Sequence, residues 1–344
     1  MIGSCITAPY SSSSIHTGSE KHLTEIHSTK SLCIAFYNVE NLFDCKDDPG
    51  IDDEEFTPTG KQHWTPEKYA KKISNIAKVI RAMNNGDGAD IVGFAEVENK
   101  GVLEDLIADP QLKKFNYGIA HHDSPDKRGI DVAAIYKKNA CTVIGRKAFY
   151  VDISHYEKRP TRDILLVTGL AGKDTLYFFL NHWPSRREGK EISEPKRIIA
   201  ATVLKKAVDS LLHANPKAKI LITGDFNDNP TDKSIAQILK AVKSVNTTSN
   251  TLYDCDYNFD LRRGEGTEFY KGQWSRFIQI IVSSSLIENR LSLEGGFDDV
   301  HIFKPGWLLI SDPASRQMIP MRTFEDNGVM GFSDHLPVYI MIGK

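Results

Sequence analysis

Hydrophobic runs of strand length recur along the chain from residue 32 onward. They are rich in β-branched and aromatic residues, and most are bounded by Gly, Pro, Asn or Asp. This pattern is typical of buried β-strands. We therefore predict strands at residues 32–37, 90–95, 132–136, 142–151, 164–170, 175–181, 219–223, 277–283 and 336–342.

Helical periodicity is confined to fewer segments, at residues 66–83, 101–108, 194–214 and 232–242. In the first, Tyr69, Ile73 and Ile80 fall on one face, and Thr65 before Pro66 is a typical helix start. Strands and helices alternate irregularly, which suits neither a βα barrel nor a sandwich of hairpins. The order predicts an α/β (α+β) fold in which sheets pack face to face with helices outside.

The first 31 residues differ from the rest. They are rich in Ser, Thr and His and have little hydrophobic periodicity, so we expect a poorly ordered segment there. No linker rich in Pro, Gly and Ser interrupts residues 32–344. Although 344 residues could hold two domains, we expect one, because the candidate site residues described below come from both ends of that segment.

Composition excludes several classes of protein. The chain has 43 Lys and Arg against 45 Asp and Glu, a formal net charge of −2, so any affinity for phosphate must be local. No apolar run approaches the roughly 20 residues that span a bilayer. Five scattered cysteines without a Cys-x-x-Cys pair argue against a disulfide scaffold or structural zinc. The compartment stays open between cytoplasm and export.

Acids, amides and imidazoles stand at the ends of five predicted strands. They are Asn38 and Glu40, Glu96 and Glu98, Asn181 and His182, Asp225 and Asn227, and Asp334 and His335. Carboxylate and amide oxygens suit Mg²⁺, Mn²⁺ or Ca²⁺, and histidines can transfer protons near neutral pH. Together these groups meet the needs of phosphate-ester hydrolysis.

The motifs that carry these residues resemble those of the endonuclease/exonuclease/phosphatase family of metal-dependent phosphoesterases. The resemblance rests on residues 37–42, 94–98, 181–185, 224–227 and 333–335, in the family's order. It implies a four-layer αββα sandwich, with two mixed β-sheets flanked by helices and the site at one end.

The resemblance also implies roles for individual residues. Glu96 would be the principal ligand of a Mg²⁺ ion, helped by Asn38 and Asp334, with Mn²⁺ or Ca²⁺ as alternatives. Asp225 would orient the attacking water, and Asn227 would bind that water or a phosphate oxygen. His335 would contact the scissile phosphate and transfer a proton, and His182 would stabilise negative charge on the phosphoryl oxygens.

Two further residues are assigned more loosely from their place in the sequence. Asp131 is expected to brace His182, and Arg162 to bind phosphate. Arg186 and Arg187 stand nearest the site in a basic run and are candidates to grip a second phosphate.

One position departs from the family's pattern. Relatives commonly carry an Asp that hydrogen-bonds the catalytic histidine where this chain has Ile278. An apolar side chain cannot orient His335, so either activity is attenuated or another acid substitutes. If the change is harmful, Ile278→Asp should raise turnover.

Three functions are consistent with these observations. The first is a metal-dependent phosphodiesterase, acting as a monomer on nucleic acid by in-line water attack. The second keeps the chemistry but acts on an inositol-phosphate or phospholipid headgroup. The third is a catalytically weakened binding protein on the same fold, suggested by Ile278.

Overall fold

The computed structural model describes residues 31–243, 251–288, 300–324 and 329–343. Apart from Ser31, the segment expected to be poorly ordered lies outside the described residues.

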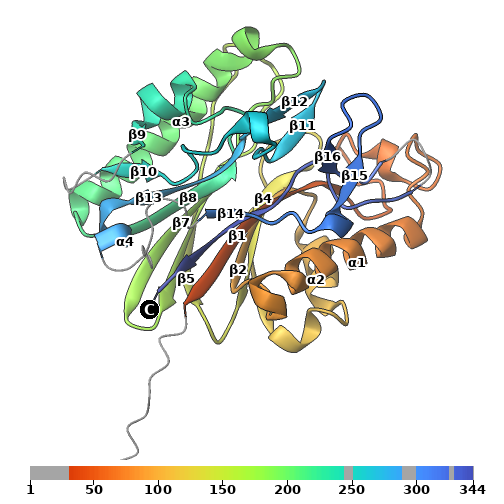
Figure 1. Ribbon diagram of the computed structural model, residues 1–344, viewed down its shortest axis with the longest axis horizontal. Helices are drawn as coiled ribbons and strands as arrows, with labels where there is room; N and C mark the ends of the chain where they lie inside the picture. The colour runs from red at the N-terminus through yellow and green to blue at the C-terminus, as the bar shows by residue number, and fades with distance from the viewer. Residues whose placement is uncertain (1–30, 244–250, 289–299, 325–328, 344) are drawn as a thin grey trace, which may run out of the picture.

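Two large mixed sheets form the centre of the molecule (Figure 1). The six-stranded sheet has the order β14-β17-β1-β2-β4-β3, and the seven-stranded sheet has the order β5-β6-β7-β8-β13-β10-β9. The strands of the first are β1 (Leu32–Leu42), β2 (Ile91–Val97), β3 (Tyr117–His121), β4 (Asp131–Lys137), β14 (Val300–Ile302) and β17 (Val338–Ile342). Those of the second are β5 (Thr142–Phe149), β6 (Ile164–Ala171), β7 (Asp174–His182), β8 (Lys219–Asp225), β9 (Ala241–Val242), β10 (Leu252–Asp254) and β13 (Ile278–Ser283).

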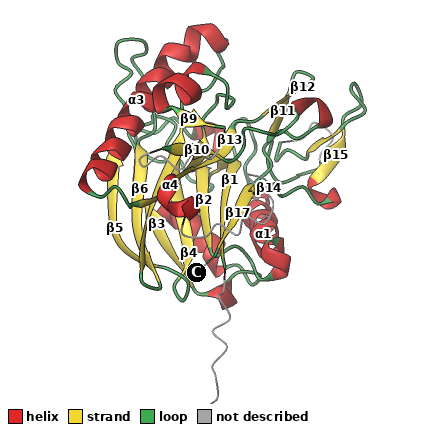
Figure 2. Ribbon diagram, turned by 60° about the vertical axis from the view of Figure 1, so that its left-hand side comes forward, coloured by secondary structure: helices red, strands yellow, loops and turns green. Residues whose placement is uncertain are grey.

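The helices cover the outer faces of these sheets (Figure 1 and Figure 2). Helices α1 (Pro66–Ala82) and α2 (Lys100–Ala108) pack on the six-stranded sheet, and α3 (Lys190–Ala214) packs on the seven-stranded sheet. As the sequence predicts, the hydroxyl of Thr65 caps α1 by accepting from the backbone N–H of Lys68. A short helix, α4 (Ser284–Glu288), follows β13, and two hairpins, β11 (Glu268–Tyr270) with β12 (Gln273–Ser275) and β15 (Leu309–Ser311) with β16 (Met318–Pro320), complete the elements.

Successive side chains along each strand point to opposite faces of its sheet, and this produces three buried hydrophobic layers. Ile34 and Phe36 of β1 meet Leu180 of β7 and Ile280 of β13 between the sheets, whereas Ala35 faces α1. The predicted four-layer αββα sandwich is confirmed.

Strands β10, β11, β12, β14, β15 and β16 and helix α4, all short, were not predicted. Two other elements also differ from the prediction. Residues 232–242 contain a π-helical turn, η4 (Ser234–Leu239), rather than a full helix. Lys240 ends it with a φ of 58°, after which β9 joins the sheet edge beside β10. Strand β3 was not predicted. It is only five residues long and contains Gly118, so its strand signal is weak.

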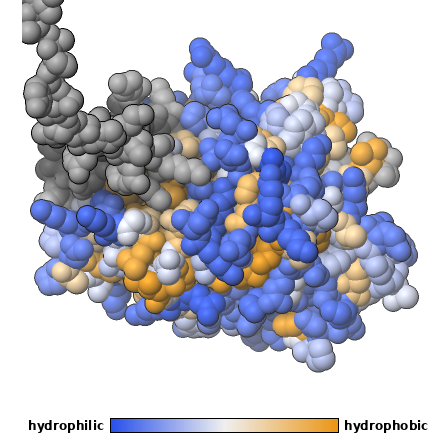
Figure 3. Space-filling model, turned by 90° about the horizontal axis from the view of Figure 1, so that it is seen from below, coloured by the Kyte–Doolittle hydropathy of each residue, from blue (hydrophilic) through white to orange (hydrophobic). Residues whose placement is uncertain are grey.

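The surface seen from below is mostly hydrophilic, with hydrophobic residues in small patches (Figure 3). Among the described residues, no helix combines the length and the apolar character needed to cross a membrane.

Candidate active site

Breaks in strand geometry mark one end of the two sheets. Strands β1 and β2 run parallel, and their register shifts between Asn38 and Leu42. Glu40, Asn41 and Glu96 have positive φ angles of 50°, 59° and 66°, a conformation that costs non-glycine residues energy and is found mainly where function requires it. At these strand ends, Oε1 of Glu96 lies 3.7 Å from Nε2 of His182 in the seven-stranded sheet, whereas the carboxylate of Glu40 binds Arg322 and the backbone N–H of Thr323.

Asn38 connects the two sheets at this end. Its Nδ2 donates to Oδ2 of Asp225 at 2.9 Å and lies 3.3 Å from Oε1 of Glu96. The second carboxylate oxygen of Glu96 accepts from the backbone N–H of Asn41 at 3.0 Å. Three of the residues singled out in the sequence therefore form one hydrogen-bonded group.

His335 lies between two of the predicted acids. Its Nδ1 is 2.7 Å from Oδ1 of Asp334, and its Nε2 is 3.3 Å from Oδ2 of Asp225. Burial disfavours the imidazolium, but Asp334, Asp225 and Glu268 more than offset burial and hold the pKa of His335 well above its ordinary value. His335 is therefore a charged donor at neutral pH.

The acids around His335 show whether another carboxylate can take the place of the Asp that relatives carry where this chain has Ile278. Ile278 is fully buried between the sheets, opposite Asp225. Glu268 of β11 pairs with His335 through a β-bridge, and burial, opposed by His335, raises the pKa of Glu268 to about 7. The sequence offered no signal for Glu268, because it lies outside every motif. Asp334 and Glu268 both act to raise the pKa of His335, so each is a candidate for the carboxylate that Ile278 does not provide.

His182 is the second buried imidazole of the site. Its Nε2 lies 3.7 Å from Oε1 of Glu96, and its Nδ1 has no hydrogen-bond partner. Burial, and then the positive charges of Arg162 and Arg128, hold its pKa well below the ordinary value. Unlike His335, this histidine is neutral at neutral pH.

Asp131 does not brace His182 as the sequence suggested. Its carboxylate instead binds Nε2 of His121 at 2.8 Å and the backbone N–H of Ser124 at 2.8 Å. Asp131 begins β4, which pairs with β3; His121 ends β3 opposite Ala133, two residues from Asp131 on the same face of the sheet. The missed strand β3 therefore explains the mistaken partner.

Arg162 and Arg186 are both partly engaged by protein groups. Arg162 binds Asp126 at 3.1 Å and the carbonyl of Trp183 at 2.7 Å. Arg186 pairs with Asp228 at 2.7 Å and donates to the carbonyl of Asn227 at 2.6 Å. Arg186 is thus a structural residue of the Asn227 turn rather than a free phosphate ligand.

Asn227 is held in a tight turn next to Asp225. Its backbone N–H donates to Oδ1 of Asp225 at 3.0 Å, its φ is 51°, and its Nδ2 donates to the carbonyl of Trp183 at 3.1 Å. This Asx turn fixes the direction of the Asp225 carboxylate.

A groove of about 320 Å³ leads away from Glu96 and Asp334. Its cationic lining comes from three separate loops and α3. These residues are Lys127, Arg128, Arg159, Arg162, Arg187 and Lys196. Asp126, Glu157 and Glu188 lie among them and offset part of this positive charge, so the groove presents guanidinium groups beside acids.

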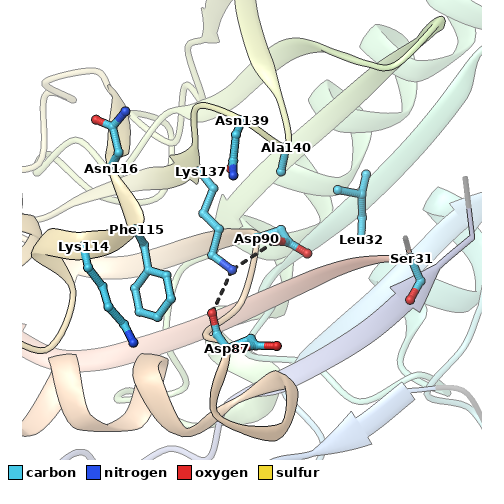
Figure 4. Close-up of a pocket in the computed structure, with 10 residues that line it drawn as sticks. All are labelled: Ser31, Leu32, Asp87, Asp90, Lys114, Phe115, Asn116, Lys137, Asn139 and Ala140. Carbon is cyan, nitrogen blue, oxygen red and sulfur yellow. Dashed lines mark hydrogen bonds and ion pairs between the residues drawn. The ribbon is translucent and has the colours of Figure 1, made fainter. Parts of the chain in front are cut away.

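A second cavity, of about 350 Å³, lies at the other end of β1, beside Leu32 (Figure 4). Its one buried cation, Lys137, is already bound to Asp90 at 3.1 Å and to the carbonyl oxygens of Asp87 and Gly88. Because its charges satisfy one another and none of the predicted site residues lines it, this cavity is not the candidate active site.

The donor set at Glu96 fits a divalent cation. Glu96 and Asp334 both face the inner end of the groove, and Asn38 adds an amide beside them. Burial and then the charge of Asp334 raise the pKa of Glu96, so a cation bound beside these two carboxylates would favour their ionised forms. Oxygen donors alone favour Mg²⁺, Mn²⁺ or Ca²⁺ over softer metals.

Comparison with known proteins agrees with this geometry. Residues 33–344 match the endonuclease/exonuclease/phosphatase family. The chain belongs to this family. Members of the family are phosphoester hydrolases that generally use divalent metals, and the fold and the enzyme class inferred from the sequence are confirmed. A search of curated proteins gives no significant match.

Solved structures share the fold at low sequence identity. Truncated TDP2 from Caenorhabditis elegans has a TM-score of 0.54 and 17% identity, with 92% of this chain and 99% of that chain covered. TDP2 from D. rerio, complexed with a single-strand DNA product, has a TM-score of 0.53 and 14% identity over 91% and 99% of the two chains. A mannosyl-6-phosphatase of Bacteroides thetaiotaomicron has a TM-score of 0.53 and 17% identity over 91% and 100%.

Proposed function

We propose that the chain is a divalent-metal-dependent phosphodiesterase that acts on nucleic acid. The observation that carries the proposal is the meeting of Asn38, Glu96, Asp225 and His335 at the end of a groove lined by guanidinium groups. Mg²⁺ is the proposed ion.

The roles of the residues follow from their charge states and contacts. Glu96, Asn38 and Asp334 would hold the ion, which when bound would polarise a phosphoryl oxygen and neutralise developing charge. Asp225, aimed by the Asn227 turn, accepts a hydrogen bond from the attacking water and orients it in line with the leaving oxygen.

The two histidines act differently because their environments differ. His335, kept protonated by its acidic neighbours, donates to the phosphate and stabilises its charge. His182 is neutral and presents Nε2 beside Glu96; it donates a hydrogen bond to a phosphoryl oxygen without adding a buried charge.

A nucleic-acid substrate is supported by the groove. Arg187 is exposed and lines the groove together with Arg128 and Lys127 of another loop, so that phosphates flanking the scissile one can be contacted. TDP2 from D. rerio, which shares the fold, is complexed with single-strand DNA.

A second substrate class is favoured by two other observations. The groove volume of about 320 Å³ suits a compact ligand, and Trp64 and Trp183 are fully buried, so neither can stack on a base. A phosphorylated sugar, such as an inositol phosphate or a phospholipid headgroup, would meet these conditions.

Hydrolysis assays separate the two classes. Plasmid and single-stranded DNA, bis-p-nitrophenyl phosphate and inositol phosphates are incubated with the protein in Mg²⁺, Mn²⁺, Ca²⁺ or EDTA. We expect metal-dependent cleavage of DNA and of the diester. Cleavage of monoesters alone would replace the nuclease proposal with the second class. Hydrolysis that persists in EDTA would contradict metal dependence.

We also infer that residues 32–344 form one domain that acts as a monomer. Asn38 and His335, near opposite ends of this segment, both contact Asp225, and every proposed site residue comes from one chain. Sedimentation of the active protein tests the oligomeric state.

A further inference from the structure

A second acidic cluster lies beside the candidate active site, on a different set of residues. Asp48 and Asp53 belong to the loop that follows β1, and Glu98 follows the end of β2. One carboxylate oxygen from each of these three residues lies within 4.8 Å of the other two. None of the three was given a role in the reaction above.

Two of these carboxylates are buried and have an oxygen without a partner. Asp53 is 0% exposed and Glu98 is 5% exposed. Oδ2 of Asp53 accepts from the backbone N–H of Asp48 at 3.2 Å, and Oε2 of Glu98 accepts from the backbone N–H of Asp44 at 2.6 Å. Oδ1 of Asp53 and Oε1 of Glu98 bind nothing. Buried carboxylate oxygens are rarely left in this state.

Within the part of the chain that the structure describes, no Lys, Arg or His forms an ion pair with Asp48, Asp53 or Glu98, although the charge of Lys46 acts on Asp48 and Glu98. The nearby basic residues pair with other acids of the same loop, Lys46 with Asp44 and Arg159 with Asp52. Like-charged carboxylates brought together in a buried position require a proton or a cation between them.

We propose that Asp48, Asp53 and Glu98 bind a Ca²⁺ ion at a structural site separate from the one at Glu96. The ligands are all carboxylate oxygens, without imidazole or thiolate, which favours a hard cation. Two come from an irregular loop, which suits the variable geometry of Ca²⁺ better than the strict octahedron of Mg²⁺. The proposal does not depend on the substrate or activity proposed above.

The ion would join two segments directly, and a backbone hydrogen bond links them to a third that lines the groove. It would fasten the loop that carries Asp48 and Asp53 to the end of β2. The same loop is already bonded to the loop that carries Arg128, because the backbone N–H of Asp52 donates to the carbonyl of Lys127 at 2.7 Å. Ca²⁺ at this position would therefore help to fix the loop that carries Arg128, which lines the groove.

The test is calcium binding by the full chain after treatment with EDTA. Thermal unfolding and isothermal titration with CaCl₂ are measured for the wild type, Asp53→Asn, Glu98→Gln and the control Asp47→Asn, an exposed acid of the same loop. Saturating Ca²⁺ should raise the melting temperature of the wild type and of Asp47→Asn by about 5 °C. Asp53→Asn and Glu98→Gln should lose this shift and bind one calcium fewer per chain.

Two further measurements separate loss of the ion from a general loss of stability. In EDTA, Asp53→Asn and Glu98→Gln should melt no lower than the wild type, because each removes a like charge from the cluster. The melting-temperature shift caused by Mg²⁺ should be the same in all four proteins if Mg²⁺ binds only at Glu96. Equal calcium shifts and stoichiometry in the wild type and both cluster variants would overturn the proposal. If a cluster variant fails to fold in EDTA, its acid is structural without an ion, and the proposal is overturned for that residue.

Discussion

Nε2 of His335 lies 3.3 Å from Oδ2 of Asp225, and this contact joins the two sheets at the candidate active site. His335 stands just before β17 of the six-stranded sheet, and Asp225 ends β8 of the seven-stranded sheet. The inter-sheet core therefore sets the position of the imidazole relative to the carboxylate. The chemistry of the site depends on how the two sheets pack.

Replacing Asp225 tests the centre of this arrangement. Asp225→Asn keeps the shape of the side chain but removes the charge that orients water and sustains the protonated state of His335. We expect kcat to fall by about 100- to 10,000-fold, measured on bis-p-nitrophenyl phosphate with Mg²⁺. Asp209→Asn on the exposed face of α3 is the matched control, and an unchanged rate in Asp225→Asn would refute the site assignment.

Substitutions at Glu268 and Ile278 test which carboxylate stabilises the protonated state of His335. From the sequence alone, Ile278→Asp should raise turnover. The structure favours the other alternative, because Asp334 and Glu268 already flank His335. We therefore expect Glu268→Gln to lower kcat by about tenfold or more.

The structure also changes the expectation for Ile278→Asp itself. A carboxylate at position 278 would be buried directly opposite Asp225, where like charges repel. We expect no gain in turnover and a lower melting temperature. A rise in kcat in this variant, with Glu268→Gln unaffected, would show that the missing Asp is a real loss.

The sequence predicted the fold and the main site residues because both depend on local signals. Strand ends, and the motifs that follow them, place Asn38, Glu96 and Asp225 without knowledge of the packing. Partners brought in by distant loops carry no such signal. Glu268, and Arg322, which pairs with Glu40 and Asp334, are visible only once the chain is folded.

The expected partner of Asp131 was wrong, and Arg186, only a candidate for a second phosphate, is held by protein groups for the same physical reason. Asp131 and Arg186 have the right chemistry near the right motif, but each is satisfied by a neighbour, His121 in one case and Asp228 in the other. Residue type and spacing show what a side chain can bind. They do not show which of several available partners it contacts.

The neutral state of His182 predicts a pH dependence of stability. Its folded-state pKa lies well below 6.5, so below that pH the unfolded chain binds a proton that the folded protein does not. The contribution of His182 to stability is therefore complete above pH 6.5 and is lost as the pH falls, by up to about 1.4 kcal/mol per pH unit.

Denaturant unfolding of metal-free protein between pH 7.5 and pH 5 measures this effect. The wild type should lose more free energy of unfolding over this range than His182→Gln, and the exposed-residue control His63→Gln should follow the wild type. Parallel curves for the wild type and His182→Gln would mean that His182 is protonated in the folded protein.

The groove predicts a difference between two adjacent arginines. Arg187 is exposed and lines the groove, whereas Arg186 is bound to Asp228 and Asn227. On single-stranded DNA, Arg187→Ala should reduce kcat/KM by about tenfold at low salt and lower the slope of log kcat/KM against log salt by about one. Its melting temperature should stay unchanged.

Arg186→Ala should instead lower the melting temperature, because Asp228 would lose a buried ion-pair partner. Arg262→Ala, outside the groove, is the control for a general loss of positive charge. Because the small diester bis-p-nitrophenyl phosphate does not reach along the groove, its hydrolysis should be insensitive to Arg187→Ala. Equal losses on DNA and on the small ester would place Arg187 at the scissile phosphate rather than at a flanking one.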